Sequence, residues 1–186
     1  MQCALCHQSV DKAEMKAIAS LNVCDACVRA TYLPGRLTKK GLHLGYSYRT
    51  DAGVIEIGDE ELLDNTLRKI SALAEAPHPS GIDATLQREG IGAKLKKIVE
   101  KEIQVGNKAF DDAVWIRTST NEETAAFLAL SGVQAAVLEL IDMNGVISIK
   151  QDKIHVEATN KGPIEVQMFV LHTAALLHYL ATFASP

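Results

Sequence analysis

The sequence has no cysteine after residue 27, and its first ten residues contain neither a basic cluster nor an apolar segment. A secretory signal peptide needs both of these features, so the start "MQCALCHQSV" predicts that the protein is cytoplasmic. Disulfides are rare in the reducing cytosol. The four cysteines are therefore not expected to form a disulfide framework.

The chain also lacks an apolar segment long enough to cross a membrane. Its longest mainly apolar stretch runs from Met168 to Phe183 and includes His172 and His178. These 16 residues are fewer than the roughly 20 that span a bilayer. The sequence predicts a helix buried across a sheet and no membrane span, with each histidine a satisfied core or rim residue.

Motifs of common enzyme classes are missing as well. Gly90 and Gly92 lack the third glycine and the preceding strand of a dinucleotide-binding fingerprint, and neither a Walker-type loop nor a nucleophile elbow occurs. The acidic pairs at 111–112 and 122–123 suggest Mg²⁺ binding or acid–base catalysis. Both pairs stand where an element begins, where acids more often act as caps or solvated surface. No catalytic residue is predicted, and the sequence favours a protein that is not an enzyme.

The sequence does have the composition of an ordered globular protein: 186 residues, 47% hydrophobic, 23% charged, with a net charge of −4. Its charge is unevenly distributed, since residues 1–50 carry seven bases and three acids, whereas the remainder is acidic. A basic head can contact nucleic acid or acidic surfaces. Four thiolates around a divalent metal ion would halve this positive excess, so charge alone does not select a partner.

Two parts are predicted from the distribution of apolar residues. Residues 1–34 contain few large apolar side chains and are predicted to be a small metal-binding module. Residues 41–184 are predicted to form an α+β domain with two ββα units and a buried C-terminal helix. The segment "PHPSG" at 77–81 is interpreted as a hinge.

The first ββα unit is predicted over 42–75. Apolar residues alternate over 42–48, a turn follows, and 54–57 is the return strand. Asp59 then caps a helix with one apolar face, formed by Leu63, Thr66, Leu67, Ile70 and Leu73. Residues 82–105 fit either a helix or a strand, and we favour a helix near 83–89 and a strand near 97–105.

The second ββα unit is predicted over 145–184. It follows a strand at 112–118 and a helix that ends at Leu130 and begins with a capping box at Ser119 or Thr120. A hairpin turns around residues 151–152, and Pro163 opens the last helix. Between the first helix and the hairpin, a second helix is predicted from the stripe of Val133, Ala136, Val137, Leu140 and Ile141.

All four cysteines fall into two pairs, Cys3-x2-Cys6 and Cys24-x2-Cys27, separated by seventeen residues. This spacing lies in the range of structural zinc sites. Each pair on one tight turn can chelate a metal, and two pairs supply the four ligands of a tetrahedron. Because residues 1–34 lack a core, zinc binding would supply most of their folding free energy, on the order of 10 kcal/mol. The sequence therefore predicts one structural Zn²⁺.

Other uses of these cysteines are a reactive dithiol pair or an iron centre. A thioredoxin-like site needs one CxxC motif at a strand–helix junction, and two such motifs ahead of any βαβ unit argue against it. His7 follows Cys6 and is a potential substitute ligand. Four cysteines suffice, and exposure to solvent is favoured for His7.

The segments "CALC", "NVCDAC" and "VRATYLPG" resemble the zinc-ribbon or treble-clef class of modules. The resemblance covers about 34 residues and implies a knuckle, a short hairpin and a second knuckle leading into a helix around one structural zinc. Nearer the C-terminus stand "FDDAVWIRTSTNEETAAFLAL", "VQAAVLELI" and "GVISIKQDKIHVEA", followed by a long apolar helix. These elements cover about 85 residues and are weakly similar to a domain of uncharacterised bacterial proteins. That second resemblance supports the α+β layout and implies no functional residue.

The function predicted from these features is that of a zinc-binding adaptor whose module presents a surface to a protein partner. The candidate contact residues are Arg29, Arg36, Lys39 and Lys40. The first alternative is nucleic-acid binding through the same basic module. Further alternatives are an enzyme with its site between the two ββα units and a redox-sensing zinc thiolate.

Overall fold

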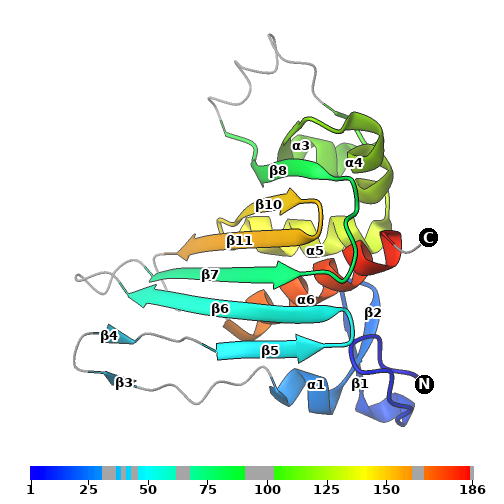
Figure 1. The fold of residues 1–186 in the computed structure, drawn as a ribbon, viewed down its shortest axis with the longest axis vertical. Coiled ribbons are helices and arrows are strands. Elements are labelled where there is room, and N and C mark those ends of the chain that lie inside the picture. Colours follow the sequence, from blue (N-terminus) through cyan, green and yellow to red (C-terminus); the bar gives the residue numbers. More distant parts are fainter. Residues whose placement is uncertain are drawn as a thin grey trace.

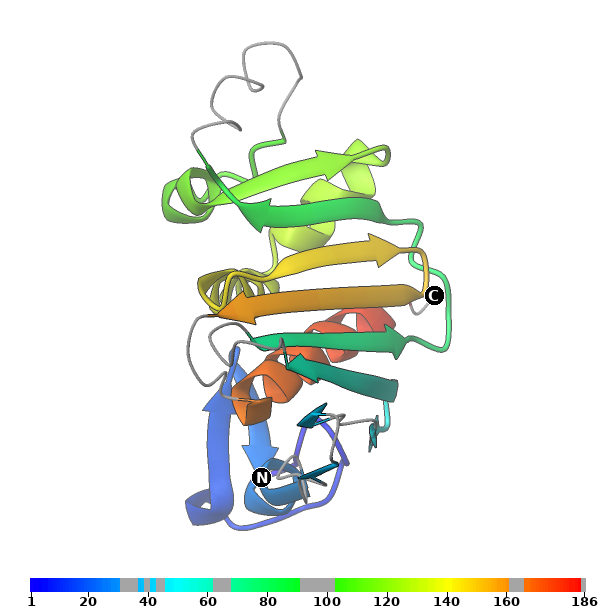
Figure 2. The ribbon, with the colours of Figure 1, turned by 90° about the vertical axis from the view of Figure 1, so that its left-hand side faces the viewer.

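The fold belongs to the α+β class and is taken from a computed structural model of the chain. The structure describes residues 1–30, 37–38, 41–42, 46–61, 68–90, 103–160 and 166–184. A large antiparallel sheet carries helices on one face, and the N-terminal module lies at one end of the molecule beside β5 (Figures 1 and 2).

The large sheet has seven strands in the order β5-β6-β7-β11-β10-β8-β9, and all neighbours pair antiparallel. Strands β5, β6 and β7 form a meander of consecutive strands. The other four strands form a second group, which joins the meander through the pairing of β11 with β7. The strands are β5 (Tyr46–Thr50), β6 (Gly53–Glu61), β7 (Arg68–Glu75), β8 (Asp83–Arg88), β9 (Val114–Thr118), β10 (Val146–Lys150) and β11 (Lys153–Asn160).

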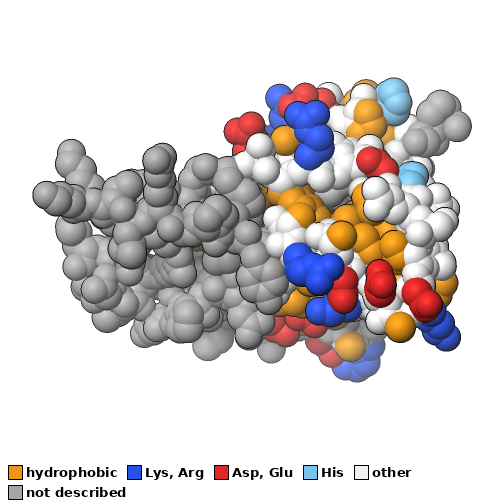
Figure 3. Space-filling view, turned by 90° about the horizontal axis from the view of Figure 1, so that it is seen from below, with side chains coloured by type: hydrophobic (Ala, Val, Ile, Leu, Met, Phe, Trp, Pro, Cys, Tyr) orange, Lys and Arg blue, Asp and Glu red, His pale blue; other side chains and the backbone are white. Residues whose placement is uncertain are grey.

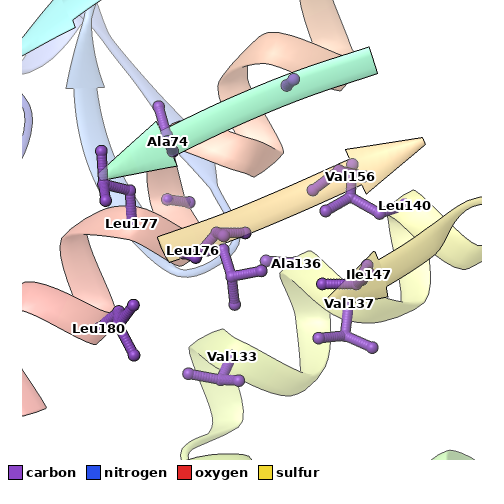
Figure 4. Packing of buried hydrophobic residues seen from close by; sticks show 14 of the residues in the cluster. Ala74, Val133, Ala136, Val137, Leu140, Ile147, Val156, Leu176, Leu177 and Leu180 are labelled. Carbon is purple, nitrogen blue, oxygen red and sulfur yellow. The ribbon is translucent and has the colours of Figure 1, made fainter. Parts of the chain in front are cut away.

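Helices α5 (Ser131–Asp142) and α6 (Val166–Phe183) cover one face of the sheet. Every residue of α6 from Phe169 to Leu177 is buried, which explains why this helix is apolar nearly all round. Small helices α3 (Lys108–Ala113) and α4 (Asn121–Leu128) flank the β8–β9 end. Figure 4 shows the core between the layers, with labelled side chains Ala74, Val133, Ala136, Val137, Leu140, Ile147, Val156, Leu176, Leu177 and Leu180.

The N-terminal module contains a 3-10 turn (Lys12–Glu14), a hairpin of β1 (Met15–Ile18) and β2 (Leu21–Cys24), and helix α1 (Asp25–Ala30). Ala19 and Ser20 both have positive φ, 47° and 65°, which is the pattern of a two-residue hairpin turn of type I′. Beyond the module, β3 (Leu37–Thr38) and β4 (Gly41–Leu42) form a separate short pair.

Several predicted elements are confirmed. The strand at 54–57 lies within β6, and the predicted stripe of α5 is buried at all five positions. Residues 146–160 form a hairpin with Gln151 at positive φ in its turn, and the buried C-terminal helix follows. Pro163, the predicted first residue of that helix, lies outside the described residues. Of the predicted strand at 42–48, Leu42 belongs to β4 and 46–48 to β5, whereas 43–45 lie outside the described residues.

The predicted helix beginning at Asp59 is wrong at both of its ends, and with it the first ββα unit. Residues 53–61 continue as β6, and Arg68–Glu75 is strand β7, paired with β6 on one side and β11 on the other. Residues 62–67, with the predicted face residues Leu63, Thr66 and Leu67, lie outside the described residues. The buried residues are Ile70, Ala72, Ala74 and Ala76, which alternate as in a strand. Alanine is a strong helix former, and its small size here lets α6 pack closely on the sheet.

Three further expectations, for the helix at 83–89 and the strands at 112–118 and 97–105, are corrected in whole or in part. The helix predicted at 83–89 is strand β8, whose buried Ala84 and Leu86 alternate with more exposed neighbours. The strand predicted at 112–118 begins only at Val114, because Asp112 and Ala113 end helix α3. Of the strand predicted near 97–105, residues 97–102 lie outside the described residues and 103–105 form no strand.

The predicted capping box of α4 does not form. Thr120 is the N-cap, but its side chain makes no capping hydrogen bond. Its Oγ1 instead accepts a hydrogen bond of 2.9 Å from the backbone N–H of Asp83. The hydroxyl thus fastens the start of α4 to the sheet.

No single described helix has both the length and the apolar character to cross a membrane. The segments Glu122–Leu128 and Ser131–Asp142 together meet the criteria of length and composition, but they are bent by 86° at their junction. The predicted division into a 1–34 module and a 41–184 domain, and the hinge at 77–81, stay predictions.

Candidate metal centre

The fold brings the four cysteines together from three local structures. Cys3 and Cys6 lie on a tight turn near the N-terminus, Cys24 is the last residue of β2, and Cys27 lies on the first turn of α1. All four Sγ atoms lie within 4.8 Å of one another, and Cys3 and Cys24 are buried. Within the described part of the chain, this is the one group of three or more ligand side chains close enough to share a metal ion.

Backbone hydrogen bonds shape the first turn. The carbonyl of Cys3 accepts from the N–H of His7 at 3.0 Å, and the N–H of Cys3 donates to the carbonyl of Gln8 at 2.9 Å. The left-handed φ of 55° at His7 reverses the chain after Cys6. The N–H of Ala4 donates to Asn22 at 2.8 Å, which ties this turn to the hairpin that carries Cys24.

The sulfur positions fit a tetrahedral ion. A regular tetrahedron with metal–sulfur bonds of about 2.3 Å has sulfur–sulfur edges of about 3.8 Å. The Cys3–Cys27 and Cys6–Cys24 Sγ distances are both 3.8 Å. A disulfide would need about 2.05 Å, and all four cysteines are free. The four thiols are therefore spaced as ligands of one metal ion.

The charges of the cluster, when its thiols are ionised, also favour a bound cation. Burial acts to raise the pKa of Cys3, but hydrogen bonds from the backbone N–H groups of Cys24, Leu5 and Cys6 lower it to about 7. Burial, and the neighbouring thiols Cys6 and Cys24, raise the pKa of Cys27 well above its usual range. Burial raises the pKa of Cys6. Four thiolates cannot coexist at this spacing without a positive charge between them, which a divalent ion provides.

Polar side chains of the sheet and of α6 hold the module in place. The Tyr48 hydroxyl donates to the carbonyl of Cys27 at 3.2 Å, and the Tyr179 hydroxyl donates to that of Ala19 at 2.9 Å. The Gln167 amide donates to the carbonyl of Val28 at 3.0 Å. Buried side chains of the module also join the hydrophobic core of the sheet, namely Cys3, Leu5, Ile18, Val23, Cys24 and Val28.

The predicted partner-binding residues are only partly described. Arg29 lies on α1 and is exposed, whereas Arg36, Lys39 and Lys40 lie outside the described residues. Figure 3 views the end of the molecule that carries the module. Acidic and basic side chains are interspersed over the described part of this face.

The two acidic pairs have local contacts. Asp111 accepts a hydrogen bond of 3.0 Å from the N–H of Val105, and Asp112 lies 2.6 Å from the Lys108 ammonium. Glu122 and Glu123 are exposed in the first turn of α4. These positions agree with the interpretation of the pairs as capping and surface residues.

The histidines of α6 differ from the expectation that both are satisfied. His172 is 4% exposed, and neither of its ring nitrogens has a hydrogen-bond partner among the described residues. Burial lowers its pKa, and the carboxylate of Glu139 on α5 opposes this shift. His178 is half-buried and lines a surface pocket with His7, His78 and Asp51. Sequence reasoning missed this pocket, because its residues are far apart in the chain and form no motif.

Comparison of the chain with protein-family models, curated proteins and solved structures finds no match. The resemblance suggested for the C-terminal 85 residues therefore has no support from a family match. The metal centre has to be interpreted from its own geometry.

Proposed function

We propose that this protein binds one structural zinc ion through Cys3, Cys6, Cys24 and Cys27, and that it acts by binding other proteins in the cytoplasm. The observation that carries the metal assignment is the mutual approach of four Sγ atoms within 4.8 Å. Four sulfur ligands at tetrahedral spacing suit zinc, and iron is the other metal that takes such a set.

The order of elements around the cysteines supports a module of the treble-clef type. The first pair lies on a turn, a short hairpin follows, and the second pair leads directly into α1. A metal ion at their centre would join the first turn, the hairpin and α1 at one point.

A structural role follows from the number of ligands. Four thiolates fill the coordination shell of zinc and leave no position for water or substrate. The ion would instead fix α1 and the hairpin, whose backbone carbonyls accept hydrogen bonds from Tyr48, Gln167 and Tyr179. Zinc would thus hold the module against the sheet and present its outer surface to a partner.

The metal assignment is tested by element analysis of the protein purified without chelator. We expect one zinc per chain and loss of that zinc in Cys24→Ser. Ser9→Ala, a change near the site that removes no sulfur, should retain it. A protein that contained iron in place of zinc, or no metal when refolded with excess Zn²⁺, would contradict the assignment.

The binding role is tested by affinity capture with an alanine series at Arg29, Arg36, Lys39 and Lys40. We expect loss of captured protein in this series. It should be retained in a control series at Lys150 and Lys153, which lie on the sheet at the β10–β11 hairpin. Captured nucleic acid that dissociates steeply with salt would support the alternative role instead. An unchanged set of captured proteins would count against the module as the binding surface.

A further inference from the structure

A pocket of about 260 Å³ lies where the N-terminal module meets the sheet and α6. Its walls come from four separate parts of the chain: the first cysteine turn, the β5–β6 turn, the segment after β7 and the second half of α6. The lining residues include His7, Asp51, His78, His178 and Ala181.

The polar groups of this pocket are three imidazoles and one carboxylate. Half of the six histidines of the chain line it. His7 Nδ1 lies 3.9 Å from Asp51 Oδ2, and these side chains are 58% and 54% exposed. His178 is half-buried on α6, where the small side chain of Ala181 leaves space beside it.

The rings of His178 and Tyr179 meet edge to face with centroids 5.9 Å apart, and His7 lies near Asp51. In the part of the chain that the structure describes, none of the three imidazoles makes a hydrogen bond. His7 is also separate from the four-sulfur cluster, which consists of cysteines alone. The histidines are therefore available to a ligand that enters from solvent.

Imidazole nitrogen and carboxylate oxygen together form the donor set of divalent transition metals such as Zn²⁺, Co²⁺ and Ni²⁺. Mg²⁺ and Ca²⁺ prefer oxygen ligands, so three imidazoles do not suit them. An anionic ligand is disfavoured because the carboxylate of Asp51 would repel it. We propose that this pocket is a second metal site, which takes an exchangeable divalent transition-metal ion through His7, His78, His178 and Asp51.

Among the described residues, the four sulfurs are the only group of three or more ligand atoms that all lie within 4.8 Å of one another. The ligand atoms of the four pocket residues do not all lie so close together. His7, His78 and Asp51 are exposed and able to rotate toward His178, which is held by the helix. The proposed site therefore assembles as the ion binds, and solvent molecules complete its shell. This distinguishes an exchangeable ion from the structural one.

The test is titration of the zinc-loaded protein with Co²⁺, followed by visible absorption. Cobalt bound to nitrogen and oxygen gives weak d–d bands, whereas cobalt bound to thiolate adds an intense charge-transfer band. We expect one equivalent of Co²⁺ to bind with d–d bands alone while zinc stays bound. Absorption that always includes the thiolate band would show displacement from the cysteines and overturn the proposal.

Substitutions in the pocket test whether the Co²⁺ absorption comes from an ion bound there. Asp51→Asn and His7→Gln change exposed side chains and should leave the fold intact, and each should weaken Co²⁺ binding by more than about tenfold. His178→Gln should do the same. The control His155→Gln alters an exposed histidine of β11 outside the pocket and should have no effect. Equal Co²⁺ affinity in the control and in the pocket variants would overturn the proposal.

Discussion

The side chain of Tyr179 on α6 occupies the space that a Cβ on Gly132 of α5 would need. An added Cβ would overlap the hydroxyl oxygen and the ring of Tyr179. The same hydroxyl donates to the carbonyl of Ala19 in the β1–β2 turn. Tyr179 therefore joins the helical layer to the N-terminal module, and the absence of a side chain at Gly132 makes this contact fit.

Gly132→Ala is expected to lower the free energy of unfolding by about 1–3 kcal/mol, because a methyl group would overpack this contact. Urea unfolding measures the change. Gly90→Ala is the control, since no atom of the described residues lies within 4 Å of a Cβ at Gly90. In a Tyr179→Leu background the effect of Gly132→Ala should shrink, and an equal effect in both backgrounds would contradict the packing explanation.

Removal of zinc is expected to release the N-terminal module and leave the large sheet folded. Metal binding contributes on the order of 10 kcal/mol in small zinc modules. Most residues of the buried core belong to the large sheet and its helices, so that part should stay packed without the metal. Hydrogen exchange after chelation should show loss of protection at β1 and β2 and retained protection at β10 and β11. Unchanged protection of β1 and β2 in the metal-free protein would argue against a structural ion.

His172→Leu is expected to stabilise the protein. A buried polar group without a partner costs about 1–3 kcal/mol, and leucine fills a similar volume without polar atoms. The free energy of unfolding at pH 7 should therefore rise in His172→Leu and stay constant in the control His155→Gln. A loss of stability in His172→Leu would indicate that the imidazole has a bound partner, such as an interior water.

The same histidine predicts a dependence of stability on pH. Burial lowers the pKa of His172 below the unfolded value of about 6.5. Below that pH the unfolded chain binds a proton that the folded ring does not, so stability falls as pH decreases. We expect a steeper loss between pH 6.5 and 5 in wild type than in His172→Leu. Parallel curves for the two proteins would exclude His172 as the source.

Tyr48→Phe tests how firmly the module is held on the sheet. It removes the hydrogen bond to the carbonyl of Cys27 but keeps the buried ring, so a loss of about 0.5–1.5 kcal/mol is expected. Gln167→Met removes the hydrogen bond to the carbonyl of Val28. In the double variant, the N-terminal module should detach from the sheet before the sheet unfolds. Separate transitions for β1–β2 and β10–β11 would support the predicted division of the chain. A single transition would show that the two parts form one cooperative unit.

The correctly predicted elements are those in which the spacing of apolar residues matches the face that the element buries. The stripe of α5 has a helical period because one side of that helix faces the sheet, and Val137 and Leu140 are buried there. The sequence predicts a helix where β7 lies, because alanines such as Ala72 and Ala74 favour a helix and give no strand pattern. They form a strand because β6 and β11 pair with them on both sides. That pairing is between distant residues and is invisible in a local pattern.

The sequence by itself singled out the four cysteines as a set that could hold one metal ion, since two CxxC pairs at this spacing leave few other uses for four thiols. It also determined the α+β class and the buried C-terminal helix. Only the tertiary structure decided that His7, Asp51, His78 and His178 line one pocket, and that His172 is buried without a partner. The physical reason is the same in each case. The two CxxC pairs have a spacing that can be recognised in the sequence. The residues of the pocket come together only through packing of distant segments, so no sequence pattern predicts them.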